Sequence, residues 1–248
     1  MYAKEVLQAV IWDIDDVLVD TSRTYHESRV AALHVIGLSP ERVQEALAVW
    51  NRLFWYFDQD DLRGIVLALA HELELDREHV AMNFDRVQEQ YDAVWSIGIP
   101  PIGGMAGIVS GLHACGVPQA VVSGGDPDYQ TEKLKSAGLD IYFNRDAIVV
   151  APSNSVLAKP NPAGILKACA VLKVDARRTL YIGDRISDVI AARLAGSIPV
   201  YFDRIPSAPE VRRAPEAGSL LLENPQYRVV GVDGLRNVLT KHFPSLFI

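Results

Sequence analysis

The sequence predicts an α/β protein in which a parallel sheet carries helices on both faces and is interrupted by an all-helical cap domain. From about residue 105 onward, short apolar runs alternate with helical periodicities, an order typical of parallel sheets. Another strand candidate, at 9–12, is separated from this region by a segment with helical spacing alone. We therefore predict an α/β core from residues 1–19 and 99–248 and a helical cap from residues 20–98.

The elements of the predicted core are short. Strands are expected at 9–12, 119–122, 148–150, 179–182, 198–202 and 227–230, with another short apolar run at 141–143. Helices are expected at 105–115, 129–137, 163–172, 187–195 and 235–242. The stretch 203–226 holds four prolines and polar filler, so we predict a long loop there.

The predicted cap contains four helices. Apolar residues recur at helical spacing over 24–37, 41–57, 61–74 and 77–95. Ser39 followed by Pro40 is a typical helix start, and the glycines and prolines of 98–104 end the block. An insertion after the first strand lies at that strand's carboxyl end, where ligands bind in open parallel sheets. That position suits a cap.

Composition narrows the classes of partner. Hydrophobic residues make up 49% and charged residues 22% of 248, as expected for a globular protein with a sizeable core. A net charge of −7 argues against general nucleic-acid binding, although a metal ion and local cations still permit an anionic substrate. The chain has no apolar run of about 18 residues, no signal-peptide core and no disulfide framework. We expect a cytoplasmic protein with no membrane partner, as a monomer or homodimer.

Four aspartates follow two of the predicted strands. Asp13 and Asp15 come after the first strand, and Asp184 and Asp188 after the run at 179–182. A carboxylate can attack phosphorus and form an acyl phosphate. The carboxylate and the phosphate are both anions and need a cation between them, and Mg²⁺, which prefers oxygen ligands, suits this role. Asp13 and Asp184 would supply such ligands, and Asp188 would hold a metal-bound water. In extended chain Asp15 faces the same side as Asp13 and would act as general acid and base.

A hydroxyl and an ammonium group complete the predicted site. Ser123 would donate a hydrogen bond to a phosphoryl oxygen, and Gly124 allows close backbone approach. Lys159 would offset the developing negative charge. Taken alone, Ser123 would be interpreted as a turn residue and Lys159 as a solvated lysine in a loop. Together with the aspartates, in one order at strand ends, they predict phosphoryl-transfer chemistry.

These residues resemble the four motifs of the haloacid dehalogenase-like hydrolase superfamily, in DIDDVL, VVSGG, AKPNP and IGDRISD. The helical insertion resembles the cap of the phosphoglycolate phosphatase and β-phosphoglucomutase branch. The resemblance implies a Rossmann-like core, Mg²⁺ dependence and an aspartyl-phosphate intermediate on Asp13, with Asp15 as acid and base. It also implies metal ligation by Asp13, the Asp15 carbonyl and Asp184, with support from Asp188.

The chain departs from the family pattern at two positions. Asp16 stands where glycine is usual and Val17 where threonine is usual; Asp tolerates a left-handed backbone better than most residues. Asp15 favours phosphate chemistry over dehalogenation, because a halide needs no proton. The sequence between Asp20 and Gly98 contains no lysine for Schiff-base cleavage of a phosphonate.

Basic residues of the predicted cap are candidates for substrate selection. Arg23, His26 and Arg29 are spaced by three and lie along one side of a helix. Arg52 lies in an aromatic-rich stretch, and Arg63 near a helix start. A solvated basic face is the alternative explanation for the first three.

The function that the sequence predicts is hydrolysis of a small phosphorylated metabolite by a Mg²⁺-dependent phosphatase. A phosphomutase acting on a sugar phosphate is the nearest alternative on the same scaffold, and would need to shield its phosphoenzyme from water. A non-catalytic protein that binds phosphorylated metabolites is the alternative from another class.

Overall fold

A computed structural model describes residues 7–54, 56–57, 61–152, 154–204 and 227–244. In these ranges the chain divides into two compact units. The core unit contains residues 7–20, 99–204 and 227–244, without 153, and the helical unit contains the described residues of 21–98. We describe each unit by itself.

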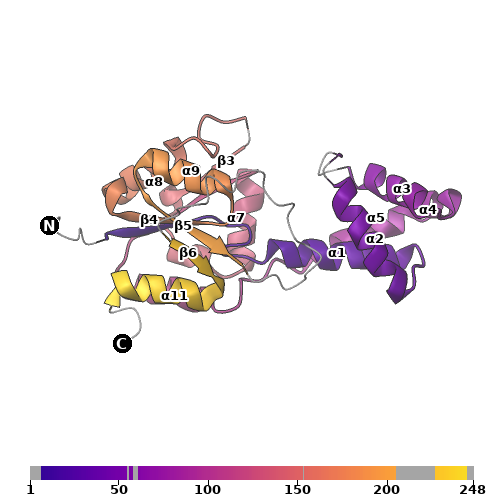
Figure 1. The fold of residues 1–248 in the computed structure, drawn as a ribbon, viewed down its shortest axis with the longest axis horizontal. Coiled ribbons are helices and arrows are strands. Elements are labelled where there is room, and N and C mark those ends of the chain that lie inside the picture. The colour runs from indigo at the N-terminus through magenta and orange to yellow at the C-terminus, as the bar shows by residue number, and fades with distance from the viewer. Residues whose placement is uncertain (1–6, 55, 58–60, 153, 205–226, 245–248) are drawn as a thin grey trace. The chain divides into compact units, whose positions relative to one another are not determined.

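A parallel sheet forms the centre of the core unit (Figure 1). In the described part of the chain it has six strands in the order β3-β2-β1-β4-β5-β6, and every pairing is parallel. The strands are β1 (Ala9–Trp12), β2 (Gln119–Gly124), β3 (Ile148–Ala151), β4 (Thr179–Gly183), β5 (Ile198–Asp203) and β6 (Tyr227–Val230). The predicted fold class is confirmed. The strand order reverses on either side of β1, which places a ligand-binding crevice at the carboxyl end of that strand.

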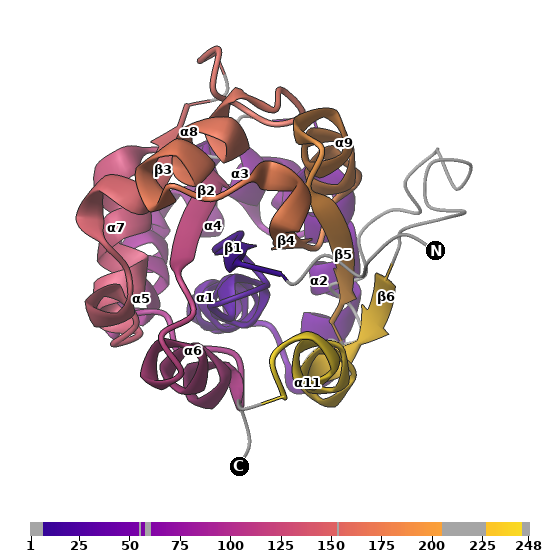
Figure 2. The same cartoon turned by 90° about the vertical axis from the view of Figure 1, so that its left-hand side faces the viewer.

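Helices cover both faces of this sheet. They are α6 (Met105–Ala114), α7 (Pro127–Ser136), α8 (Ala163–Leu172), α9 (Ile186–Ala195) and α11 (Gly231–His242). In Figure 2, α8 and α9 lie on one face of the sheet, and α6 and α11 lie on the other. Ile11, Val122 and Tyr181 of the central strands are buried with Ile165 of α8 and Ala192 of α9. This apolar layer holds the strand ends in register.

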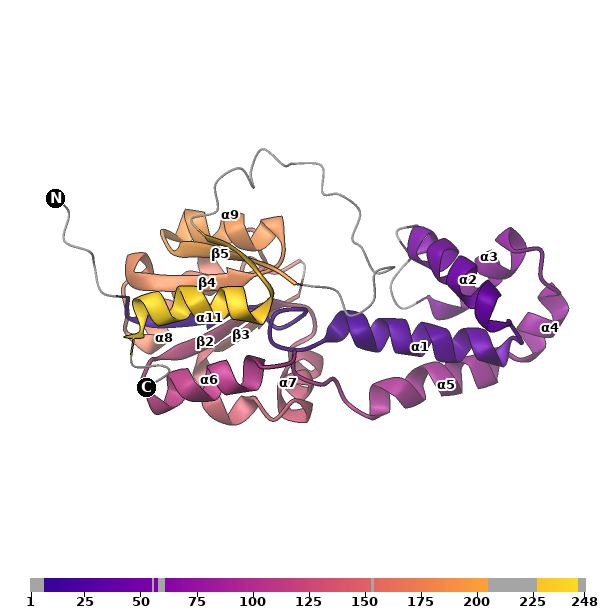
Figure 3. The same cartoon turned by 60° about the horizontal axis from the view of Figure 1, so that its bottom comes forward.

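The helical unit has its own hydrophobic core and five helices in its described residues. They are α1 (Thr21–Val35), α2 (Pro40–Leu53), α3 (Leu62–Glu72), α4 (Arg77–Met82) and α5 (Phe84–Ser96). Helices α1 and α5 run along one another (Figure 3). Leu33, Leu47, Trp50, Leu69 and Val87 are buried together in its centre.

The expectation of about four helices in this unit is one short, because the segment 77–95 forms two. Asn83 separates α4 from α5, and its Nδ2 atom donates a 2.9 Å hydrogen bond to the His79 carbonyl. The Asn83 amide donates to the same carbonyl over 3.2 Å, so both the main chain and the side chain of Asn83 bind the end of α4. Helix α2 does begin at Pro40, but the Ser39 side chain makes no capping bond.

Three other expectations from the sequence concern the run 141–143, the loop 203–226 and membrane-spanning helices. The run 141–143 is no strand, since Asp140–Tyr142 forms a 3₁₀ turn. Most of the predicted loop at 203–226 lies outside the described residues. No helix in the described ranges is both long and apolar enough to cross a membrane.

The two connections between the units leave the core next to each other. The Asp20 amide donates to the Pro100 carbonyl over 2.9 Å, and the Ile102 amide donates to the Leu18 carbonyl over 3.0 Å. Val19 and Pro101 form an antiparallel bridge between these bonds. The chain therefore passes from the core unit to the helical unit and back through two segments that are hydrogen-bonded to each other.

Candidate active site

Asp13 lies at the carboxyl end of the central strand β1. Trp12 is aligned with Val121 of β2 and with Ile182 of β4, and the Asp13 amide donates to the Ile182 carbonyl over 2.9 Å. The side chain of Asp13 is buried. Strand pairing on both sides thus fixes the direction in which this carboxylate leaves the sheet.

Asp184 and Asp188 join Asp13 in a buried acidic cluster. Asp184 follows β4 and Asp188 lies in the first turn of α9. One carboxylate oxygen from each of the three residues lies within 4.8 Å of the others. Gly183 makes this possible, because a Cβ atom there would lie 2.4 Å from the Asp188 side chain. Asp188 Oδ2 also accepts a 2.9 Å bond from the Arg185 amide, which orients it.

Lys159 reaches into this cluster from the loop after β3. Its Nζ atom lies 2.9 Å from Asp13 Oδ1 and 2.6 Å from Asp188 Oδ1. Burial alone would lower the pKa of Lys159, but the two carboxylates outweigh it and raise the pKa well above its ordinary value. Burial raises the pKa of Asp13, and the Lys159 ammonium opposes this rise.

The donor set of the cluster fits a hard divalent cation. Three buried carboxylates lie together, and the ammonium of Lys159 contacts two of them, so the site keeps a net negative charge, which is costly in a low-dielectric interior. The ligand atoms are all oxygen, which Mg²⁺ prefers. Asp13, Asp184 and Asp188 are therefore suited to hold such an ion.

Tyr181 is a part of the site that the sequence analysis missed. Its hydroxyl lies 2.9 Å from the Val122 carbonyl oxygen and 3.2 Å from Asp188 Oδ1. Lys159 Nζ lies 5.9 Å from the centre of its ring. The sequence shows only a tyrosine within an apolar strand, and nothing there indicates that it supports two site residues.

Ser123 and Gly124 end β2, beside Asp13. Ser123 is buried, and within the described ranges its Oγ atom has one long contact, 3.5 Å to the Gly124 carbonyl. Gly125 has φ = 111°, and a Cβ there would lie 3.0 Å from Gln130 Nε2. The chain then turns into α7 at Pro127. A loop of this shape brings backbone amides close to a bound anion.

Both oxygens of Asp15 are held by side chains of α7 that the sequence analysis also missed. Lys133 Nζ lies 2.6 Å from Asp15 Oδ1, and Gln130 Nε2 donates to Oδ2 over 2.8 Å. Gln130 donates to the Gly124 carbonyl as well, over 2.9 Å. The available signal was a glutamine and a lysine in the same i, i+3, i+4 row as the buried Leu134.

Asp16 takes the left-handed backbone that its family position requires, with φ = 58°. Its Oδ1 atom lies 2.6 Å from Arg204 Nη1, and Arg204 Nη2 lies 2.5 Å from Asp20 Oδ1. These side chains are about nine-tenths buried. Arg204 was not predicted, because no local pattern marks an arginine after β5 as a partner of residues so distant in sequence.

The predicted cap residues have contacts within the helical unit. Arg23 pairs with Glu27 at 2.7 Å and Arg52 pairs with Glu72 at 2.9 Å, all with exposed side chains. Arg63 lies over the Phe84 ring at 5.0 Å, and His26 is half-buried. An exposed ion pair of this kind favours the solvated-face explanation for Arg23.

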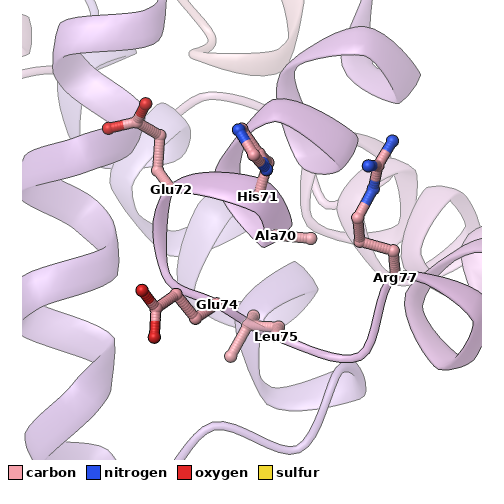
Figure 4. A pocket seen from close by; sticks show the side chains of 6 residues that line it. All are labelled: Ala70, His71, Glu72, Glu74, Leu75 and Arg77. Carbon is pink, nitrogen blue, oxygen red and sulfur yellow. The ribbon is translucent and has the colours of Figure 1, made fainter.

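A shallow hollow in the helical unit contains none of the predicted site residues (Figure 4). Its volume is about 370 Å³, and it lies at the turn from α3 to α4. It is lined by Ala70, His71, Glu72, Glu74, Leu75 and Arg77. Its charged and imidazole side chains are exposed, so the hollow offers no enclosed site.

The fold and the site together define an α/β enzyme with a buried carboxylate cluster at the carboxyl end of its central strand. The family model for haloacid dehalogenase-like hydrolases matches residues 7–196. The chain belongs to that family, as its four motifs predicted.

Similar proteins agree with this membership. The chain is 25% identical over 194 residues to an N-acetylmuramic acid 6-phosphate phosphatase of Pseudomonas aeruginosa, covering 77% of this chain and 79% of that protein. It is 26% identical over 203 residues to a phosphoglycolate phosphatase of Neisseria gonorrhoeae, covering 80% of each. A haloacid dehalogenase family hydrolase of Deinococcus radiodurans, solved with phosphate and sodium, has the same fold, with a TM-score of 0.68, 21% identity and 96% coverage of both chains.

Proposed function

We propose that this chain is a Mg²⁺-dependent phosphomonoester hydrolase that acts on a small phosphorylated metabolite. The observation that carries the proposal is the buried cluster of Asp13, Asp184 and Asp188 around Lys159, at the end of the central strand. The relatives named as phosphatases of small phosphorylated compounds support it.

In the proposed reaction Asp13 is the nucleophile. Its carboxylate attacks phosphorus, the bond from phosphorus to the ester oxygen breaks, and Asp15 gives its proton to the leaving alcohol. Asp15 then takes a proton from water, and the resulting hydroxide attacks the aspartyl phosphate. Phosphate leaves, and Asp13 is regenerated as a carboxylate.

The other site residues bind the phosphoryl group and limit its charge. Lys159 places an ammonium between Asp13 and Asp188, and Ser123 has a buried hydroxyl available to a phosphoryl oxygen. Gly124 lets the backbone approach that group. Asp13, the Asp15 carbonyl and Asp184 would hold Mg²⁺ with support from Asp188, and the ion would reduce repulsion between nucleophile and phosphate.

We further propose that the helical unit is the cap of this enzyme and that residues 20–98 form a separate domain. Arg23, His26, Arg52 and Arg63 remain candidates for contacts with the substrate. The proposed location is cytoplasmic, and the free thiols of the described chain are compatible with a reducing compartment.

Phosphate release from a panel of phosphomonoesters, with Mg²⁺ and with EDTA, tests this function. We expect metal-dependent release from a small group of compounds, and loss of release in Asp13→Asn with unchanged circular dichroism. Isomerisation of a sugar phosphate without release would indicate the phosphomutase instead. Binding without any turnover would indicate the non-catalytic alternative and refute the hydrolase.

Asp15→Asn tests the proton transfer separately. A leaving group such as p-nitrophenolate needs no proton, whereas an alkoxide does. We therefore expect Asp15→Asn to slow the first step with alkyl phosphates far more than with p-nitrophenyl phosphate. Single-turnover kinetics measures that step, and equal losses for both substrates would contradict the acid role.

A further inference from the structure

Arg204, the residue after β5, binds two carboxylates within the core unit. Its Nη1 atom lies 2.6 Å from Asp16 Oδ1, and its Nη2 atom lies 2.5 Å from Asp20 Oδ1. The three side chains are between 9% and 13% exposed. Strand β4 lies between β5 and β1 in the sheet, so Arg204 reaches past a whole strand to the segment that follows β1. A guanidinium presents two donor atoms at a fixed spacing to such a pair of acceptors.

The two carboxylates lie at the two ends of one tight turn, residues 16–20. The Asp16 amide donates to the Val19 carbonyl over 2.9 Å, and the Val19 amide donates to the Ile14 carbonyl over 3.1 Å. Asp15 also forms a parallel bridge with Val19. The backbone that carries Asp15 is therefore bonded to the turn that Arg204 binds.

Asp16 carries a side chain at a position where glycine would fit the backbone better. Its φ is 58°, in the left-handed region where a Cβ atom is unfavourable. The family pattern has glycine here, whereas this chain has an aspartate whose carboxylate contacts Arg204. That ion pair offsets the unfavourable backbone, and it connects the residue directly after Asp15 to the end of β5.

The side chain of Asp15 is held from the other side of β1. Lys133 and Gln130 of α7 bind its two oxygens at 2.6 Å and 2.8 Å. Helix α7 follows β2 and Arg204 follows β5, and these two strands lie on opposite sides of β1. Contacts from α7 hold the carboxylate, and contacts from Arg204 hold the main chain next to it.

We propose that Arg204 is a positioning residue for Asp15: its two ion pairs hold the turn and thereby direct the Asp15 carboxylate toward the leaving oxygen. The inference rests on the proposed phosphatase function, in which Asp15 gives that oxygen a proton. Proton transfer requires a donor within hydrogen-bond reach, and a displacement of about 1 Å slows such a step by about 100-fold. Arg204 acts through Asp16 and Asp20, not by contact with the reacting atoms.

Hydrogen exchange of the protein without substrate tests whether Arg204 holds the turn. In Arg204→Met we expect the amides of residues 15–20 to exchange about 10-fold faster or more, because the turn loses a contact at each end. Arg204→Lys keeps the charge without the two-donor geometry and should fall between the two. Arg228→Met is the matched control, since it removes an exposed pair with Asp203 between β6 and the end of β5, and it should leave the turn unchanged. Unchanged exchange in Arg204→Met would overturn the inference.

Single-turnover kinetics with two leaving groups tests the link to Asp15. An alkoxide needs a proton in order to leave, whereas p-nitrophenolate does not, so we expect Arg204→Met to slow the first step about 10-fold or more with an alkyl phosphate and less than about 3-fold with p-nitrophenyl phosphate. In an Asp15→Asn background the same substitution should slow the alkyl phosphate no further, because the group that it positions is gone. Equal losses for both substrates, or an undiminished further loss in Asp15→Asn, would overturn the inference.

A second variant keeps the test decisive where Arg204→Met does not fold. Removal of the guanidinium alone leaves two buried carboxylates without that ion pair, which is destabilising. Arg204→Met combined with Asp16→Asn and Asp20→Asn removes all three charges together. It should show the same faster exchange and the same dependence on the leaving group as Arg204→Met, and wild-type behaviour in both measurements would overturn the inference.

The two measurements also separate this inference from the proposed function. No phosphate release from any compound by the unmodified protein would refute the hydrolase, and faster exchange in Arg204→Met would still show that Arg204 holds the turn. Phosphate release with the same losses for both leaving groups would keep the hydrolase and refute the positioning role.

Discussion

Lys133 Nζ lies 2.6 Å from Asp15 Oδ1, so a buried ammonium of α7 holds the carboxylate next to the proposed nucleophile. Gln130 Nε2 holds the other oxygen at 2.8 Å. Lys133 has 6% of its side chain exposed, and Asp15 has 24%. Helix α7 therefore sets the direction of Asp15 while leaving part of the carboxylate open to a ligand.

Replacement of Lys133 should reduce turnover more than substrate binding. In Lys133→Met the Asp15 carboxylate loses its ionic partner and adopts other rotamers, so we expect kcat to fall about 10-fold or more with KM within about 2-fold. Steady-state kinetics measures both. Lys135→Met is the matched control, because Lys135 lies on the same helix with 55% of its side chain exposed. A rise in KM alone would contradict a positioning role for Lys133.

Removal of the Asp13 charge should stabilise the metal-free protein. Burial raises the pKa of Asp13 in the folded state, with Lys159 opposing. The stability that such a carboxyl contributes to the folded protein is fully present when the pH is below its unfolded-state pKa. This stability is lost as the pH rises through its folded-state pKa. At pH 7 ionised Asp13 thus opposes folding, and we expect Asp13→Asn to raise Tm in EDTA by about 2–4 °C.

Mg²⁺ provides the internal comparison for this prediction. The ion relieves the same repulsion that Asp13→Asn removes, so it should raise the Tm of the unmodified protein more than that of the variant. Scanning calorimetry with and without Mg²⁺ measures both shifts. A lower Tm for Asp13→Asn in EDTA would mean that the Lys159 ion pair outweighs the burial of Asp13.

The left-handed backbone of Asp16 should decide which substitutions it tolerates. Glycine and alanine both remove the ion pair with Arg204, but only alanine adds a Cβ at φ = 58°. We expect Asp16→Ala to be less stable than Asp16→Gly by about 1 kcal/mol in the free energy of unfolding. Urea denaturation measures this difference. Equal stability of the two variants would show that the loop relaxes away from the left-handed conformation.

The Tyr181 hydroxyl should matter for metal affinity. Tyr181→Phe removes the group that lies 3.2 Å from Asp188 Oδ1, so this carboxylate loses an orienting contact. Outer contacts of this kind change metal affinity by about 10-fold, and we expect a loss of that order for Mg²⁺ in titration calorimetry. Tyr56→Phe, at a side chain that is 81% exposed, should leave the affinity unchanged. Unchanged affinity in Tyr181→Phe would refute the supporting role.

Strands β1 to β5 could be predicted because each contains a continuous run of at least three apolar residues. Strands β1 and β6 begin and end at the residues that the sequence indicates, and the others differ by one or two residues. A strand that is buried on both faces needs apolar residues throughout, and polar residues follow at its end. The break at Asn83 was missed because it does not disturb the apolar period on either side.

The motif residues of the candidate site could be located from sequence, but their supports could not. Asp13, Ser123 and Asp184 follow apolar runs, so local pattern marks them. Lys133 and Arg204 contact residues 118 and 184 or more positions away, and only the parallel sheet brings those segments together. A buried lysine on a polar helix has the same local pattern as an exposed one.

The paired connections at Leu18–Asp20 and Pro100–Ile102 have a consequence for how such a protein can change. Because the chain leaves and re-enters the core at adjoining points, everything between them is a single contiguous stretch of gene with both ends anchored together. Exchange of that stretch as a cassette would replace the whole helical unit in one step. The residues proposed to break the phosphate ester lie outside that stretch and would stay unchanged. A change of substrate would then require no change in the catalytic residues.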